Sequence, residues 1–144
     1  MFVEREEMKV LLISLAVFVV GWEAWWWIVG VRPIGPLRLR KMLQKSGESR
    51  PLLFDVRTAA EFRLFHIEGA ENHPGLLLDP CSLGLPDRER PVVVICLSGH
   101  RSPIAGFKLK KWRFKNVYYL SWGMLAWMIT GGRVERSLRK DRSA

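Results

Sequence analysis

A run of four β-branched residues, Val92–Ile95, is followed at once by Cys96 and a short polar segment. Such an unbroken apolar run predicts a strand that is buried on both faces of a parallel sheet. Further on, Ser102 before Pro103 predicts a helix N-cap with proline at the first helical position, and the helix is expected to reach about Trp112. This order of strand, loop and helix constrains the chain to an α/β fold. It places Cys96 at the carboxyl end of a strand, where such folds bind ligands.

The loop after this strand has the composition of a reactive site. Backbone N–H groups can converge on the Cys96 sulfur there, and the helix dipole adds roughly half a positive charge. Helix N-termini and nearby cations stabilise the thiolate, which is the nucleophilic form of cysteine. Gly99 can adopt positive φ, and the permanent charge of Arg101 can hold a small oxyanion. A buried structural cysteine is the alternative interpretation, but glycine, arginine, serine and proline in this order favour a reactive site.

The remainder of the chain alternates helices with short apolar strands. Helices are predicted over 37–44, 59–65 and 124–129, and strands over 52–56, around Ala70 and over 117–120. Gly131-Gly132 is expected to end the last helix. This alternation predicts one domain with a small parallel sheet that is covered by helices on both faces.

The Cys96 loop resembles the active-site loop of the rhodanese family, whose pattern is Cys-x-x-Gly-x-Arg-Ser. Other markers of that family are matched by Asp55-Val56-Arg57, Glu61-Phe62, His66-Ile67, Gly69-Ala70, Asn72 with Pro74, Phe114, Asn116-Val117-Tyr118, Leu120, Gly123-Met124 and Ala126-Trp127. The resemblance covers about residues 34–132. The chain departs from the family pattern at Phe65, Glu71, His73 and Trp122, and at Trp122 the family commonly has glycine.

The resemblance implies a rhodanese-like fold and a thiosulfate sulfurtransferase type of activity (EC 2.8.1) without a cofactor. Cys96 is implied as the catalytic nucleophile that carries sulfane sulfur as a persulfide, from a donor such as thiosulfate to a thiol or protein acceptor. The implied substrate-binding loop consists of Leu97, Ser98, Gly99, His100, Arg101 and Ser102. Related cysteine phosphatases have one more residue in this loop, so the four residues between Cys96 and Arg101 favour sulfur chemistry.

Several residues outside the loop have more ordinary interpretations. Asp55 and Arg57 can support the site, but mutual pairing is the favoured role. Thr58 and Glu61 match a capping box, so Glu61 is expected to stabilise a helix start. No cysteine or histidine spacing predicts a metal site, and His66 and His73 stand apart from any such cluster. Cys81, in a turn-rich stretch, is expected to be an ordinary loop cysteine, with resolution of an oxidised Cys96 as the alternative.

The N-terminal part predicts a single transmembrane helix. Residues 10–31 are apolar except for Ser14 and Glu23, which is enough at ~1.5 Å per residue to cross a ~30 Å hydrocarbon layer. Tryptophans crowd the C-terminal end of this run and are expected at the headgroup boundary: Trp22, Trp25, Trp26 and Trp27. A cleaved signal peptide is disfavoured by the acidic start and these bulky side chains. A buried soluble helix is disfavoured because a small domain has little room for it.

Charge predicts the orientation of this helix. Few basic residues precede it and several follow it, so the positive-inside rule places the catalytic domain in the cytoplasm, at a bacterial inner membrane. A periplasmic domain is the alternative. The formal net charge of +9 comes without a nucleic-acid motif, so anionic lipids rather than nucleic acid are the expected partners of the basic surface.

The predicted organisation is a tail (1–9), the membrane helix (10–31), a linker (32–36), the rhodanese-like domain (37–132) and a basic tail (133–144). A membrane-anchored sulfurtransferase is the favoured function. The alternative is a membrane-tethered interaction or regulatory module with little catalytic turnover. Such a module would hold a partner protein, and another membrane protein is one candidate.

Overall fold

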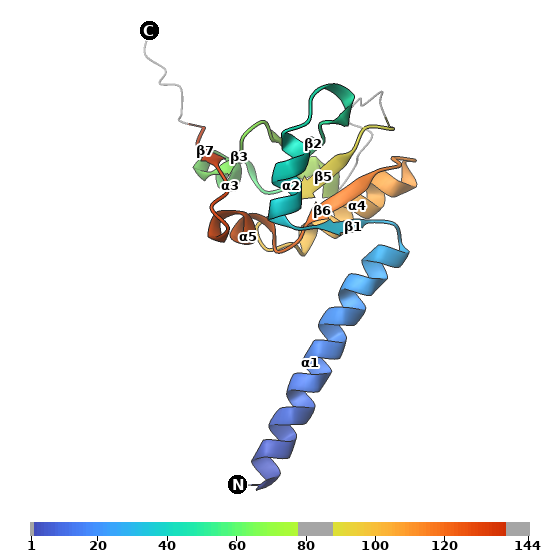
Figure 1. Cartoon of the computed structure of the whole chain (residues 1–144), viewed down its shortest axis with the longest axis vertical. Coiled ribbons are helices and arrows are strands. Elements are labelled where there is room, and N and C mark those ends of the chain that lie inside the picture. Colours follow the sequence, from blue (N-terminus) through green and yellow to red (C-terminus); the bar gives the residue numbers. More distant parts are fainter. Residues whose placement is uncertain (1, 78–87, 138–144) are drawn as a thin grey trace.

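A five-stranded parallel sheet forms the centre of the domain (Figure 1). The computed structural model describes residues 2–77 and 88–137. The strand order is β1-β6-β5-β2-β4, so β5 lies in the middle. The strands are β1 (Arg32–Ile34), β2 (Leu52–Asp55), β4 (Glu71–Asn72), β5 (Val92–Ile95) and β6 (Val117–Leu120).

Helices cover both faces of this sheet. Along β5, Val92 and Val94 belong to a core cluster with α4 (Arg101–Lys111), whereas Val93 and Ile95 pack with α2 (Pro36–Leu43) and α5 (Gly123–Ile129) on the other face. This alternation is the period of two expected of a strand that is buried on both sides. The remaining elements of the domain are η1 (Gly47–Ser49), α3 (Ala59–Leu64), β3 (His66–Ile67), η2 (Pro74–Leu77) and β7 (Val134–Glu135).

The α/β fold class predicted from the sequence is confirmed. The predicted strands at 52–56 and 117–120 and the predicted helices at 37–44, 59–65 and 124–129 all occur within one or two residues of their expected bounds. Thr58 and Glu61 form the expected capping box at the start of α3. Gly131, with φ of +73°, follows α5 and its N–H donates to the Met128 carbonyl, so the helix ends where the glycine pair predicted.

The structure corrects the prediction at both ends of the domain. Residues 32–36 were expected to be a linker, but Arg32–Ile34 forms β1, which pairs in parallel with β6. Pro33 lacks an N–H and fits there because β1 is an edge strand. The basic tail was expected to begin at 133, but β7 pairs antiparallel with β3, and Ile67 lies opposite Val134.

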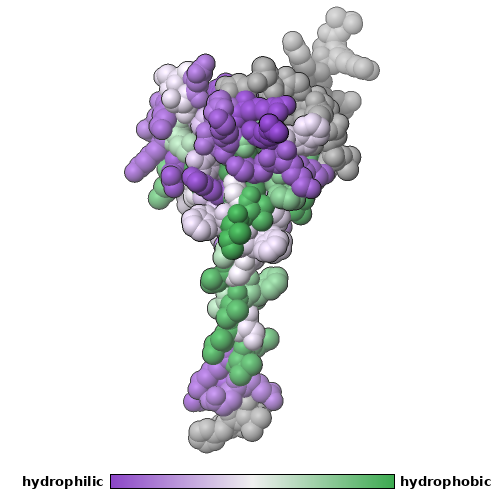
Figure 2. Space-filling model, turned by 90° about the vertical axis from the view of Figure 1, so that its right-hand side faces the viewer, coloured by the Kyte–Doolittle hydropathy of each residue, from purple (hydrophilic) through white to green (hydrophobic). Residues whose placement is uncertain are grey.

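The N-terminal helix α1 (Phe2–Ile28) projects away from the domain (Figure 1). Its segment Arg5–Ile28, 24 residues, is long and apolar enough to cross a membrane. Figure 2 shows a hydrophobic column between a hydrophilic N-terminal end and the hydrophilic domain. The predicted span reached residue 31, but the helix ends at Ile28, and Gly30 then turns the chain with φ of +87°.

The tryptophans at the end of α1 divide between two environments. Trp26 is only 9% exposed and joins the core cluster on the α4 face, and Trp22 packs partly buried against the same cluster. Trp25 and Trp27 are more than half exposed. The expectation that all four indoles line the headgroup boundary is therefore corrected, because the C-terminal end of α1 contacts the domain and two of the indoles face it.

Candidate active site

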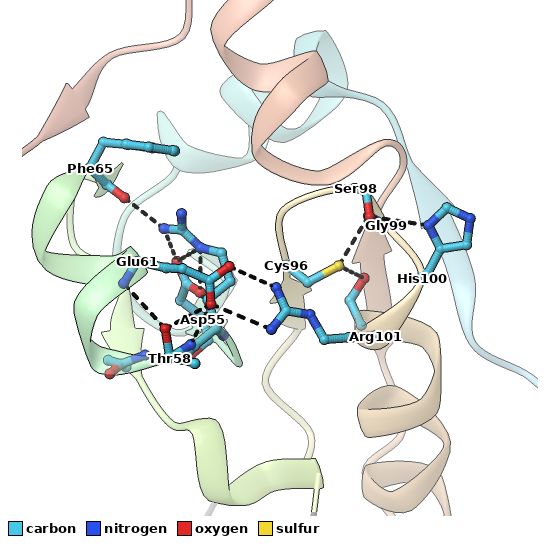
Figure 3. Close-up of polar contacts among 12 residues, drawn as sticks. Asp55, Thr58, Glu61, Phe65, Cys96, Ser98, Gly99, His100 and Arg101 are labelled. Carbon is cyan, nitrogen blue, oxygen red and sulfur yellow. Dashed lines mark hydrogen bonds and ion pairs between the residues drawn. The ribbon is translucent and has the colours of Figure 1, made fainter.

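The Cys96 sulfur lies inside the loop that joins β5 to α4. Cys96 is fully buried. The N–H of Gly99 donates to Cys96 Sγ at 3.0 Å, and the Cys96 thiol donates to Ser102 Oγ, with sulfur and oxygen 3.5 Å apart (Figure 3). Gly99 adopts φ of +89°, a conformation that favours glycine and turns its N–H toward the sulfur. The loop therefore surrounds the sulfur with hydrogen-bonding groups.

The start of α4 differs from the prediction. The sequence pattern predicted Ser102 as the N-cap, but α4 begins at Arg101 and His100 occupies the N-cap position without a side-chain capping bond. Ser102 lies in the first helical turn and is fully buried. Its hydroxyl is directed to the Cys96 sulfur rather than to a backbone N–H, so its role belongs to the site and not to the helix end.

The N-terminus of α5 fixes the first half of the loop. The N–H of Met124 donates to the Cys96 carbonyl at 2.9 Å, and the N–H of Leu125 donates to the Leu97 carbonyl at 3.1 Å. A Cβ atom on Gly123 would lie 2.3 Å from the Cys96 carbonyl oxygen, so only glycine allows this approach. The sequence did not predict this contact, because it joins segments more than 25 residues apart.

The Arg101 side chain pairs with Glu61 at the start of α3. Arg101 Nη2 lies 3.0 Å from Glu61 Oε1, and both side chains are about one-third exposed. The hydrogen bond from Arg101 lowers the pKa of Glu61 from an ordinary value of 4.5 to about 2, with help from the Thr58 hydrogen bonds. The same hydrogen bond raises the pKa of Arg101. Sequence reasoning gave Glu61 only the capping role, which it does have, and missed its second role as the partner of Arg101.

Asp55, which is labelled beside the site in Figure 3, forms a buried ion pair with Arg57. Arg57 Nη2 donates to Asp55 Oδ2 at 2.7 Å and to the Phe65 carbonyl at 2.6 Å. Both side chains are fully buried, so each charge compensates the other. Within the described residues, Arg57 Nη1 has no hydrogen-bond partner. The geometry agrees with the favoured interpretation of mutual pairing.

The other loop residues divide between the core and the surface. Leu97 packs against the core cluster on the α5 face. Ser98 Oγ lies 3.1 Å from His100 Nδ1, and the His100 ring lies 6.3 Å from that of Trp22 on α1. This proximity brings the apolar helix to the edge of the candidate site.

The sequence predicts no metal site. Over residues 2–77 and 88–137, no group of three or more histidine, cysteine or acidic residues could hold a metal ion. Cys81, for which two interpretations were open, lies outside the residues that the structure describes.

Comparisons with known proteins agree with this geometry. The family model of the rhodanese-like domain matches residues 36–130. Thiosulfate sulfurtransferase GlpE of Shewanella oneidensis is 32% identical over 91 residues, which cover 63% of this chain and 89% of that protein. A tRNA uridine(34) hydroxylase of Protochlamydia amoebophila is 30% identical over 106 residues, which cover 69% of this chain. The chain spans only about a third of that hydroxylase, 32% of its length.

A solved structure extends the likeness to the fold. The thiosulfate sulfurtransferase of Pseudomonas aeruginosa superimposes with a TM-score of 0.64 at 24% identity, over 75% of this chain and 21% of that one. The similarity thus concerns one domain within a longer protein. The family resemblance drawn from the Cys96 loop and its flanking markers is confirmed. Because the family model covers well over half of the residues, this chain belongs to the rhodanese-like domain family.

Proposed function

We propose that this protein is a membrane-anchored sulfurtransferase that carries sulfane sulfur as a persulfide on Cys96. The observation that carries the proposal is the contact of the Gly99 N–H with Cys96 Sγ at 3.0 Å. A backbone donor aimed at the sulfur stabilises negative charge there without reorganisation. Rhodanese-family membership and the thiosulfate sulfurtransferases among the relatives support the same class of reaction.

In the first half of the cycle, the Cys96 thiolate attacks the outer sulfur of thiosulfate. A bond forms between Sγ and that sulfur, the bond between the two thiosulfate sulfurs breaks, and its electron pair leaves with sulfite. The enzyme then holds a persulfide. Arg101 is the cation that would attract the donor dianion, and Glu61 would hold its guanidinium in place.

In the second half, a thiophilic acceptor attacks the outer sulfur of the persulfide. The sulfur–sulfur bond breaks, and the electron pair returns to Cys96 as thiolate. Cyanide, as an assay acceptor, would give thiocyanate, and a small or protein thiol would give a new persulfide. The Gly99 N–H would stabilise Sγ as a thiolate before sulfur is loaded and again after the acceptor has taken it, whereas the charge of the persulfide lies on its outer sulfur.

The proposed anchor is α1. Its 24-residue segment Arg5–Ile28 has the length and composition of a membrane span. The basic residues after it favour a domain on the cytoplasmic side. A membrane location would bring the basic domain close to anionic lipids and to sulfur acceptors in or near the bilayer.

The test is the intact mass of the full chain, purified in detergent and exposed to thiosulfate. A gain of one sulfur, about 32 Da, that cyanide removes supports the persulfide. The Cys96→Ser variant should gain nothing, and Cys81→Ser should gain as much as the wild type. If the wild type gains no sulfur from thiosulfate or other sulfane donors, the proposal fails and a membrane-tethered interaction module becomes the leading account.

A further inference from the structure

The outer face of α5 is apolar and has no partner within the described residues. Leu125 is 43% exposed and Ile129 is 84% exposed, and Trp122, just before the helix, is 62% exposed. Leu125 and Ile129 are four residues apart and so lie on one side of the helix, and Trp122 precedes the first residue of the helix. Residues 122–130 include no charged side chain. We call this set, Trp122, Leu125 and Ile129, the α5 face.

The α5 face continues into the apolar surface of α1. Trp122 lines a cavity of about 150 Å³ together with Phe18 and Trp22 of α1 and with His100 of the active-site loop. In Figure 1, α5 lies on the side of the domain from which α1 extends. Trp122 therefore brings one end of the α5 face next to an apolar helix of membrane-spanning length.

Trp122 is an unusual residue for its position. Its φ of +59° lies in the left-handed region, where a bulky side chain is strained. Its 62% exposure means that the isolated domain gains little burial from the indole. Strain of this kind persists where surrounding contacts hold the backbone in place, and such residues are frequent at functional sites.

We propose that the α5 face is a second membrane contact, seated at the boundary between headgroups and acyl chains of the bilayer that α1 spans. This proposal rests on the membrane anchor proposed above and not on the sulfur chemistry. Tryptophan favours that boundary, and leucine and isoleucine favour the layer beneath it. The continuity with α1 through the shared cavity identifies lipid, rather than a second protein, as the occupant.

The contact has a consequence for the active site. The N–H groups of Met124 and Leu125 donate to the carbonyls of Cys96 and Leu97, so backbone hydrogen bonds connect α5 directly to the loop. With the α5 face in the bilayer, the loop residues that border the cavity, Ser98 to His100, lie beside the membrane surface. Sulfur acceptors that reside at that surface would then meet the site directly.

The experiment measures the environment of single spin labels on the full chain in phosphatidylcholine–phosphatidylglycerol vesicles. Labels at Leu125→Cys and Ile129→Cys, in a Cys81→Ser background, are compared for collision with oxygen and with a water-soluble nickel chelate. Val17→Cys on α1 is the reference within the span, and Ser49→Cys on η1 is the reference in solvent. The background chain without an added cysteine corrects for any labelling of the buried Cys96.

Lipid contact predicts that positions 125 and 129 resemble position 17, with high collision with oxygen and low collision with the nickel chelate. Equal nickel collision at positions 125, 129 and 49 overturns the proposal. Protection from both reagents also overturns it, because a protein would then cover the face. If position 17 itself collides with nickel, the membrane anchor fails first and this proposal fails with it. None of these collision measurements depends on sulfur transfer. A failure of the persulfide chemistry can therefore be distinguished from a failure of the membrane contact.

Discussion

At the scale of single residues, two side-chain interactions define the chemistry around Cys96. Ser102 Oγ lies 3.5 Å from the sulfur in the first turn of α4. Arg101, one residue earlier, turns away to Glu61 on α3. Neighbouring residues at the start of one helix thus have different partners: Ser102 contacts the sulfur, and Arg101 forms an ion pair with Glu61.

The Ser102 hydroxyl can donate to the sulfur once Cys96 is a thiolate, so Ser102→Ala removes one stabilising hydrogen bond. A loss of about 1 kcal/mol corresponds to roughly fivefold slower sulfur loading. The measurement is the single-turnover rate of the thiosulfate mass gain. Ser98→Ala is the matched control, since that hydroxyl contacts His100 and not the sulfur. Equal rates for both variants would contradict the role of Ser102.

The ion pair of Glu61 and Arg101 predicts a pH dependence of stability. Glu61→Gln keeps a side chain that can form the capping box but loses the charge, and we expect a cost of about 0.5–1 kcal/mol at neutral pH for this partly exposed pair. The folded-state pKa of Glu61 is lowered to about 2 from 4.5. The contribution of the ion pair to the free energy of unfolding is therefore complete above about pH 4.5 and is lost as the pH falls toward 2.

The measurement is chemical denaturation of the full chain in detergent, wild type against Glu61→Gln, from pH 7 to pH 2.5. The difference in the free energy of unfolding should stay constant down to about pH 4.5 and then shrink. A difference that grows on acidification would show that the ion pair does not cause it.

At the scale of secondary structure, the Cys96 loop is fixed by α5 as well as by α4. Gly123 adopts φ of +55° and its α-carbon lies so close to the loop that an added Cβ would meet the Cys96 and Leu97 carbonyl oxygens at 2.3 and 2.6 Å. The helix, and not the loop sequence alone, therefore determines where the sulfur is held.

Gly123→Ala should separate α5 from the loop. We expect a cost of about 3 kcal/mol or more in the free energy of unfolding, because backbone atoms must move, together with loss of sulfur loading. Gly131→Ala is the matched control: its φ is also positive, but apart from its chain neighbours no atom of the described residues lies within 4 Å of the Cβ position, so only about 1 kcal/mol is expected. Thermal unfolding and mass gain check both variants, and similar costs would contradict the steric explanation.

At the scale of the whole molecule, the end of α1 belongs to the domain. Trp26 is buried with the α4-face core, and the Tyr119 hydroxyl donates to a Glu23 carboxylate oxygen. Burial of Tyr119, with this hydrogen bond, raises its pKa. Side-chain packing thus joins α1 to the domain, and a fragment that starts after α1 would lack part of the core of the domain.

Trp26→Ala should destabilise the domain by about 3 kcal/mol, as expected for removal of a buried indole. Trp25→Ala is the matched control, since Trp25 is 61% exposed, and its change should stay within about 0.5 kcal/mol. Chemical denaturation in detergent, followed by the circular dichroism of the domain, measures both. Equal effects would mean that α1 does not pack on the domain in solution.

The sequence alone predicted much of the fold and the identity of the central loop. Short apolar runs and glycine, proline and capping signals act within a few residues, so β2, β5, β6 and the helices α2, α3 and α5 were expected close to their observed places. The spacing of Cys96, Gly99 and Arg101 within one loop is likewise local. The family resemblance followed from such local markers, and the family model confirms it.

Tertiary structure decided which residues meet. β1 and β7 are too short for a periodic signal, and each exists because a partner strand supplies its hydrogen bonds. The pairing of Glu61 with Arg101 joins residues 40 positions apart. Ser102 had the pattern of an N-cap, but its hydroxyl faces Cys96. Trp22 and Trp26 had the pattern of membrane-boundary residues, but packing on the sheet turned them inward. In each case, a long-range contact replaced the local preference.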